Sequence, residues 1–320
     1  MDIVKHIKNK KTFLITTHVA PDGDAICSEL AISYLLEKLG KKVFIINDNV
    51  VPDHYKFLNG IEKIKTFEEY KKEDFDAVVI VDCPTLERIG RVKDLLKEHY
   101  IINIDHHISN EDFADVSFVE PQASSSAEVI YNMYKQLGIG FNKDIATYIY
   151  IAMLTDTGSF NYSNTNGQTH NIVAELLSFG IEPYDISVKV YASKRLCDIR
   201  LLGMVLETLD VEFKGTLAYM ICTKEMIDKS GSDISATENF VNYAREVKTA
   251  KVGLFIRQNT DDTNIYKVSI RTKDDISATN IANTFGGGGH IHAAGCTIKG
   301  SLKEVKKTLF KAVEKEFGRK

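Results

Sequence analysis

Short, almost wholly apolar runs in the first half of the chain restrict its fold more than any other feature. The runs at 77–81 (Ala-Val-Val-Ile-Val) and 100–104 (Tyr-Ile-Ile-Asn-Ile) predict strands, as do residues 12–17 and 42–47. Strands this apolar are buried on both faces, which is typical of parallel sheets. An amphipathic stretch at 24–39 and further helical stretches separate the strands, so the first half is expected to be a parallel, doubly wound α/β sheet.

The second half predicts a different architecture, because its strands follow one another with fewer helices between them. We expect a smaller α+β domain with strands near 208–213, 217–222, 251–257, 266–271 and 295–298. Residues 184–207 look helical and carry few groups suited to chemistry. The predicted organisation is a first domain over 1–185, a helical connector over 186–207 and a second domain over 208–320.

The charge of the chain limits the partners that it could bind. Its 320 residues carry a formal net charge of −4 and have a pI of about 6.2, which argues against a broad basic surface for long nucleic acid.

The five cysteines include no CxxC pair, so we expect reduced thiols and no zinc site. An apolar leader and a run of about 18 apolar residues are both missing, which predicts a soluble, cytoplasmic protein with no membrane partner.

Acidic and imidazole side chains follow several of the predicted strands. His18 follows the first strand, Asp82 follows residues 77–81, and the triplet Asp-His-His at 105–107 follows residues 100–104. Ligands of open α/β sheets bind beyond the carboxyl ends of the strands. We therefore expect these side chains to meet at one edge of the sheet, although they are far apart in the sequence.

Four aspartates predict a metal site at that edge. Asp22 and Asp24 flank Gly23 in a Pro/Gly turn, and Asp156 ends a predicted helix. Together with Asp82 they carry four negative charges, which would repel one another strongly unless two divalent cations balanced them. Carboxylate and imidazole ligands without thiolate suit Mn²⁺ or a similar ion better than structural zinc.

Each of these residues also has a simpler interpretation. The aspartates could be turn or helix-cap residues, and the two histidines at 106–107 could lie on the surface. Their common position at the ends of successive strands favours the metal site.

At these residues the chain resembles the DHH phosphoesterase family, whose name describes the triplet at 105–107. It is most similar to the nanoRNase/pAp-phosphatase branch of that family. The matching motifs are His18–Asp24, Asp82, Asp105–His107, Thr155–Phe160, Ser269–Arg271, Gly286–His290 and Ala293–Gly295. The resemblance implies a DHH catalytic domain in the first half, a DHH-associated substrate-binding domain in the second, and two divalent metal ions, Mn²⁺, as cofactors.

The resemblance also implies a role for each matching side chain. The implied ligands are His18, Asp22 and Asp82 for one ion, and Asp24, Asp82, His106 and Asp156 for the other. Asp82 would bridge the two ions. Asp105 is expected to orient an imidazole and His107 to face the substrate phosphate, so these two form the expected catalytic pair.

The glycine run at 286–289 needs a reason, because glycine loses more conformational entropy on folding than other residues. Successive backbone N–H groups could cradle a phosphate, and an arginine at a strand end could grip one through its fork of donors. The simpler alternatives are a flexible turn and an arginine paired with a carboxylate. The resemblance favours substrate binding by Arg271, Gly287, Gly288, Gly289 and His290.

The expected reaction is metal-assisted hydrolysis of a phosphate ester, since two ions can lower the pKa of a shared water and neutralise the phosphate. The resemblance and the acidic pI favour an exoribonuclease for short oligoribonucleotides (nanoRNA) that is also a phosphatase for 3′-phosphoadenosine 5′-phosphate (pAp). Linear pApA and cyclic di-AMP are close candidates. An inorganic pyrophosphatase or polyphosphatase and a non-catalytic nucleotide sensor are the alternatives, and the sequence leaves a homodimer open.

Overall fold

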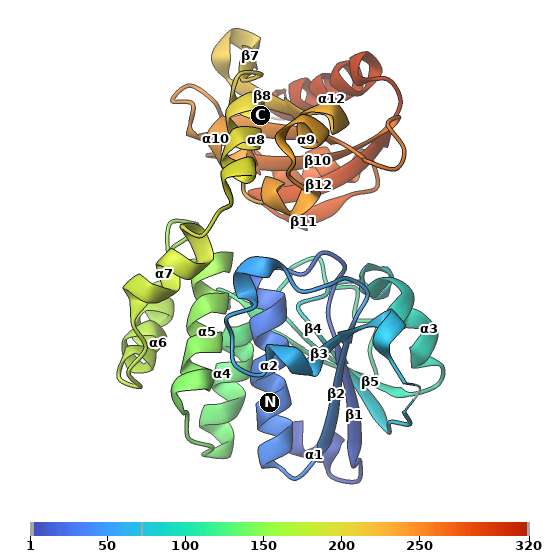
Figure 1. The fold of residues 1–320 in the computed structure, drawn as a ribbon, viewed down its shortest axis with the longest axis vertical. Coiled ribbons are helices and arrows are strands. Elements are labelled where there is room, and N and C mark those ends of the chain that lie inside the picture. The colour runs from blue at the N-terminus through green and yellow to red at the C-terminus, as the bar shows by residue number, and fades with distance from the viewer. Residues whose placement is uncertain (1–2, 72, 319–320) are drawn as a thin grey trace. The chain divides into compact units, whose positions relative to one another are not determined.

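The chain has two compact units, with the boundary in the sequence between Ser193 and Lys194, and each unit contains one sheet (Figure 1). The computed structural model describes residues 3–71 and 73–318, except for the side chain of His290. Within those residues, every helix is too short or too polar to cross a membrane.

The first sheet is parallel throughout and has the strand order β3-β2-β1-β4-β5-β6. Its strands are β1 (Thr12–Thr16), β2 (Lys42–Asn47), β3 (Ile64–Thr66), β4 (Ala77–Val81), β5 (Tyr100–Asp105) and β6 (Val116–Val119). The chain runs outward from β1 to β3 and then builds the other half from β4, so the predicted doubly wound sheet is confirmed. The sequence does not predict the edge strands β3 and β6, because three or four residues are too few to show a pattern.

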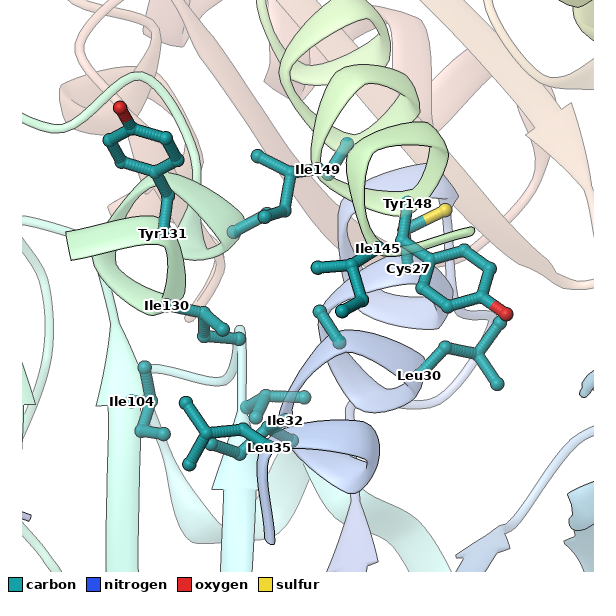
Figure 2. Packing of buried hydrophobic residues seen from close by; sticks show 14 of the residues in the cluster. Cys27, Leu30, Ile32, Leu35, Ile104, Ile130, Tyr131, Ile145, Tyr148 and Ile149 are labelled. Atoms are coloured by element: carbon teal, nitrogen blue, oxygen red, sulfur yellow. The ribbon is translucent and has the colours of Figure 1, made fainter. Parts of the chain in front are cut away.

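Helices cover both faces of this sheet. They are α1 (Ile3–Ile7), α2 (Gly23–Lys38), α3 (Lys93–Leu96), α4 (Ser126–Leu137), α5 (Lys143–Asp156), α6 (Gly167–Leu177) and α7 (Pro183–Tyr191). On one face α2, α4 and α5 pack around Ile32, Ile104 and Ile149 (Figure 2). On the other, α3 and the 3₁₀ segment Leu86–Val92 pack around a smaller cluster that includes Leu14. Most residues of α2 are buried, because this helix lies between the sheet and other helices.

The second sheet is mixed and has the strand order β11-β12-β10-β9-β8-β7. Its strands are β7 (Asp210–Glu212), β8 (Leu217–Cys222), β9 (Val252–Gln258), β10 (Ile265–Thr272), β11 (Gly288–His290) and β12 (Ala293–Lys299). Its helices are α8 (Leu196–Leu206), α9 (Lys224–Ser230), α10 (Val241–Glu246), α11 (Ala278–Asn283) and α12 (Leu302–Phe317). Of its strand pairs, only β8 and β9 run parallel among the described residues, and the predicted α+β class is confirmed.

The residues expected to form a connector, 186–207, contribute to both cores. Ile186 and Val190 of α7 are buried in the core of the first unit. Leu201 and Val205 of α8 are buried in the second unit, where they pack against β8 and β9. Each of these two helices therefore buries its apolar face in the unit to which it belongs.

Part of the glycine run forms a strand. Gly288 pairs with Gly295, and Gly289 pairs with Ala294, so β11 is the edge strand of the second sheet. The flexible turn that the sequence leaves as an alternative is therefore wrong for these two glycines. Gly287 lies just before the strand, where a Cβ would stand 2.2 Å from the carbonyl oxygen of Gly295, so only glycine fits.

Candidate metal centre

The strand order places the centre of the first sheet at β1 and β4, where the direction of winding reverses. In doubly wound sheets ligands bind at the carboxyl ends of the strands, at this reversal. β1 and β4 are paired in register, with Thr16 opposite Ile80. His18 therefore follows one strand and Asp82 follows its neighbour, which is why residues 64 positions apart come together.

The first group of ligating atoms combines His18, Asp22 and Asp82, whose candidate atoms all lie within 4.8 Å of one another. Nε2 of His18 is 3.5 Å from Oδ2 of Asp82. Nδ1 of His18 lies 2.9 Å from the carbonyl oxygen of Val19, which can only accept, so Nε2 keeps its lone pair for a cation. Burial lowers the pKa of His18 to about 4, and a neutral imidazole at pH 7 is the form that binds a metal.

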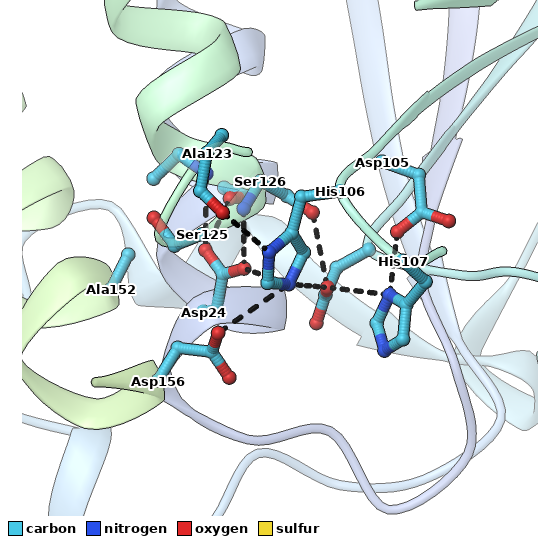
Figure 3. A network of polar contacts seen from close by, with 12 residues as sticks. Asp24, Asp105, His106, His107, Ala123, Ser125, Ser126, Ala152 and Asp156 are labelled. Atoms are coloured by element: carbon cyan, nitrogen blue, oxygen red, sulfur yellow. Dashed lines mark hydrogen bonds and ion pairs between the residues drawn. The ribbon is translucent and has the colours of Figure 1, made fainter. Parts of the chain in front are cut away.

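The second group combines Asp24, His106 and Asp156 (Figure 3). Nε2 of His106 lies 3.9 Å from Oδ2 of Asp24, 3.6 Å from Oδ1 of Asp82 and 3.4 Å from Oδ2 of Asp156. These separations are longer than ordinary hydrogen bonds, as expected of ligands around a shared ion. Nδ1 of His106 lies 3.2 Å from the carbonyl oxygen of Ala123, which directs Nε2 toward the carboxylates.

Asp82 connects the two groups. Its Oδ2 is the oxygen nearest to His18, and its Oδ1 is the oxygen near His106. One carboxylate thus presents each of its oxygens to a different group, which is the geometry of a bridging ligand. Its backbone has φ of 51°, a conformation that non-glycine residues rarely adopt and that is found mainly at functional sites.

The electrostatics of the centre also suit cations. Burial, followed by repulsion from Asp24 and Asp22, raises the pKa of Asp82 well above its ordinary value. Burial raises the pKa of Asp24 as well. Burial acts to lower the pKa of His106, but Asp156 and Asp24 raise it. Buried carboxylates this close to one another are costly unless cations compensate them, so the residues present fit two divalent ions.

The N-terminus of α4 supports the carboxylates, and sequence reasoning missed this contribution. The backbone N–H groups of Ser126 and Ala127 donate to Asp24 at 2.7 and 3.1 Å, and Oγ of Ser126 donates to Asp82 at 3.0 Å. Figure 3 shows Ser126 beside Asp24. A helix N-terminus stabilises negative charge through such groups. The signal in the sequence is the serine run at 124–126, where Ser125 caps the helix by accepting from the backbone N–H of Glu128.

Asp105 and His107 form a pair beside the metal ligands. Nδ1 of His107 donates to Oδ1 of Asp105 at 2.7 Å, and the amide nitrogen of Asn110 donates to Oδ2 of Asp105 at 2.6 Å. Burial acts to raise the pKa of Asp105, but the hydrogen bond and charge of His107 bring it down to about 2. His107 also lines a hollow of about 290 Å³ with Asn110 and Ser117. Asn110 is a second residue that sequence reasoning missed.

Of the residues expected to bind substrate, Arg271 and the residues 288–290 lie on strands of the second sheet, and Gly287 directly precedes β11. Arg271 is half-buried on β10 and pairs with Ala293 of β12, which pairs in turn with His290 of β11. One guanidinium N–H of Arg271 donates to the carbonyl oxygen of Ile270 at 3.1 Å. The prediction for the imidazole of His290 falls on a side chain outside the described residues.

Comparison with known proteins identifies the class that this fold and site define. Residues 12–153 match the DHH family, N-terminal domain, and residues 215–319 match the DHHA1 domain. The chain belongs to the DHH family, as its resemblance implies.

Two curated relatives and one solved structure are similar over most of the chain. The bifunctional oligoribonuclease and PAP phosphatase NrnA of Thermus thermophilus is 32% identical over 95% of this chain and 90% of the relative. The protein of the same name in Bacillus subtilis is 24% identical over 93% and 92%. The crystal structure of an exopolyphosphatase-related protein from Bacteroides fragilis has a TM-score of 0.88 and is 31% identical, covering 98% of this chain and 94% of that one.

Proposed function

We propose that this protein is a phosphoesterase with two Mn²⁺ ions that hydrolyses short oligoribonucleotides and pAp. The observation that carries the proposal is Asp82, whose two oxygens face different groups of histidine and aspartate ligands. The NrnA relatives, whose names state both activities, support the choice of substrates. Linear pApA belongs to this substrate class because it is a dinucleotide, and cyclic di-AMP is a further candidate.

In this proposal His18, Asp22 and Asp82 would hold one ion, and Asp24, Asp82, His106 and Asp156 would hold the other. When bound, the ions supply an activated water and neutralise the phosphate oxygens. The chain keeps the ligands in place through Ser126 and the carbonyl groups that accept from the two imidazoles.

His107 is the proposed acid of the reaction. Asp105 accepts the hydrogen of Nδ1, so the ring orientation is fixed and Nε2 lies on the opposite side of the ring. A protonated His107 would donate from Nε2 to the oxygen of the leaving alcohol. Asn110 holds Asp105 from its other side, so the pair is oriented before substrate arrives.

Substrate binding is assigned to the second unit. Arg271 would donate to a substrate phosphate, and the N–H groups at the outer edge of β11 would add further donors near Gly287, Gly288, Gly289 and His290. A cytoplasmic location is part of the proposal, since five unpaired thiols suit a reducing compartment.

A screen of substrates with Mn²⁺ tests the function. The purified protein is incubated with pAp, pApA, labelled di- to pentanucleotides, a long RNA, pyrophosphate and tripolyphosphate, and the products are separated. We expect hydrolysis of pAp and the short RNAs. Release of phosphate from pyrophosphate or tripolyphosphate alone would establish the pyrophosphatase or polyphosphatase alternative instead. Binding of nucleotides without any product, in every divalent ion tried, would identify a sensor.

A further inference from the structure

In the second sheet β10, β12 and β11 lie side by side (Figure 1), and one face of these strands is exposed at Lys267, Gly295 and Thr297. On this face, α8, α9 and α10 form a core with β8 and β9, while α11 and α12 pack on the opposite face. Lys267 of β10 and Gly295 and Thr297 of β12 are exposed. Because side chains alternate along a strand, these residues point away from the core that contains Val268 and Cys296.

Two cations are direct neighbours on this exposed face. Lys267 of β10 pairs in register with Arg257 of β9, and like charges directly opposite each other destabilise a sheet. Neither side chain forms a hydrogen bond or ion pair with another described residue. Burial lowers the pKa of Arg257, with only Cys222 acting to raise it, and the partial burial of the Lys267 stem together with the charge of Arg257 lowers the pKa of Lys267. Among the described residues, the fold therefore holds two positive charges together without a compensating carboxylate.

A third cation lies farther along the same face of β10. Arg271 follows Lys267 by four residues, so both side chains are on one face, about 14 Å apart along the strand. Each nucleotide adds about twice as many bonds to the chain backbone as an amino acid does, so an extended RNA strand advances about twice as far per residue as a β-strand. The distance between Lys267 and Arg271 therefore corresponds to about two nucleotides of an extended RNA strand.

The surface between the cations has almost no side chains. Ser269 of β10 is opposite Gly295 of β12, which is opposite Gly288 of β11. A Cβ at Gly288 would meet no atom within 4 Å, and a Cβ at Gly295 would meet only the carbonyl oxygen of Val268, at 3.4 Å. Neither glycine has a positive φ. Packing and backbone conformation thus do not require glycine at these positions, whereas bare backbone leaves room for a ligand to lie on the sheet.

We propose that Arg257 and Lys267 form a second phosphate-binding position, which binds the backbone of a single-stranded oligoribonucleotide whose other phosphate lies at Arg271. The inference rests on the proposed function and adds a preference for chain length. A strand with three or more consecutive phosphates, such as a 5′-phosphorylated trinucleotide, reaches both positions, whereas pAp and pApA, with two phosphates each, reach one. The contacts are to phosphate and not to base edges, so binding is expected to be insensitive to sequence.

The variant Arg257→Gln/Lys267→Gln tests the inference in the full chain. The control Lys303→Gln/Lys307→Gln removes the same charge from exposed positions of α12, which packs on the other face of the sheet. Fluorescence anisotropy measures the binding of labelled tri- to pentanucleotides with Mn²⁺ chelated, over a range of KCl concentrations. We expect pentanucleotide affinity to fall about tenfold or more. The slope of log affinity against log salt should fall by about 0.7 for each lost contact.

Kinetics give a second measurement. The ratio of kcat/KM for the pentanucleotide to kcat/KM for pApA should fall by about the same factor as the affinity. An unchanged ratio with an unchanged salt slope would contradict the second position, as would equal losses for both substrates. An equal effect of the variant on the binding of inorganic tripolyphosphate would indicate a general anion site and would also contradict the proposal.

Gly295→Leu provides a test that leaves every charge in place. A Cβ at this position would meet only the carbonyl oxygen of Val268, at 3.4 Å, so we expect little change in Tm together with weaker binding of the pentanucleotide. Unweakened binding in this variant would exclude an RNA path across the sheet. If the unsubstituted enzyme hydrolyses none of the nucleotides, the proposed function is wrong. The anisotropy experiment would still decide separately whether RNA binds this face.

Discussion

Oγ of Ser126 donates a hydrogen bond of 3.0 Å to Oδ1 of Asp82, so the first residue of α4 holds the proposed bridging ligand. The backbone N–H of the same serine donates to Asp24 at 2.7 Å. Ser126 therefore contacts both Asp82, which faces both groups of ligands, and Asp24, which belongs to one of them. A residue in this position orients metal ligands without binding the metal.

Ser126→Ala should weaken Mn²⁺ binding by about tenfold or more, because Asp82 loses the donor that orients it. Isothermal titration calorimetry measures the affinity. Ser125→Ala is the matched control, since Ser125 caps the same helix by accepting from the backbone N–H of Glu128. That control should cost about 1 kcal/mol of stability and leave the Mn²⁺ affinity unchanged. Lower stability with an unchanged Mn²⁺ affinity in Ser126→Ala would show that Ser126 acts only on the helix.

Asp82→Asn should abolish turnover and also the stabilisation by Mn²⁺. A cation that binds only the folded state raises Tm, so Mn²⁺ should raise the Tm of the unsubstituted protein by several degrees above that measured with chelator. In chelator, the variant should be more stable than the unsubstituted protein, because burial and neighbouring aspartates disfavour the charge of Asp82. Differential scanning calorimetry measures both effects. An equal rise in Tm with Mn²⁺ in the two proteins would show that Asp82 does not bridge the ions.

Asp105→Asn should lower kcat by about 100-fold or more while Mn²⁺ affinity changes little, because Asp105 contacts His107 at 2.7 Å and orients its ring. His107→Gln should have a similar effect. The double variant should be no worse than the worse single variant, since the two residues act as one unit. Losses that multiply in the double variant would mean that the two residues act independently.

Arg271→Ala should raise KM for pAp by about tenfold or more and change kcat less, because the arginine is proposed to bind the substrate phosphate. Steady-state kinetics separate the two constants. Arg200→Ala removes a comparable charge from an exposed position of α8 and should leave both constants unchanged. A fall in kcat alone would place Arg271 in the chemical step and not in substrate binding.

Glu29→Gln should reduce the pH dependence of stability. Glu29 is fully buried on α2 and accepts from the amide nitrogen of Asn47 at 2.8 Å, and burial raises its pKa from 4.5 to about 8. The folded state therefore binds the proton more tightly. The contribution of protonated Glu29 to the free energy of unfolding is complete below pH 4.5. It is lost as the pH rises toward 8, at about 1.4 kcal/mol per pH unit.

Urea unfolding at several values between about pH 5 and 8 measures this dependence. The Glu29→Gln variant should show a smaller decline than the unsubstituted protein. Glu37→Gln, on an exposed turn of the same helix, should decline as the unsubstituted protein does. Equal slopes for all three proteins would show that Glu29 titrates normally.

Much of the first sheet follows from local pattern. Ala77–Val81 is apolar at every position, and its strand ends as the sequence predicts. Asp82 follows it directly, so the sequence also indicates which residue lies at the sheet edge. The second sheet is predicted less well at β11, because two glycines carry no strand pattern and pair only through β12.

The sequence by itself determined which residue types stand at the ends of the strands, because strand formation and burial depend on patterns of a few neighbouring residues. Only the tertiary structure decided that Ser126 reaches Asp24 across 102 positions and that each oxygen of Asp82 faces a different histidine. Such contacts depend on the register of β1 with β4 and on where α4 begins. Both are set by the packing of the whole unit, and no local stretch of sequence contains that information.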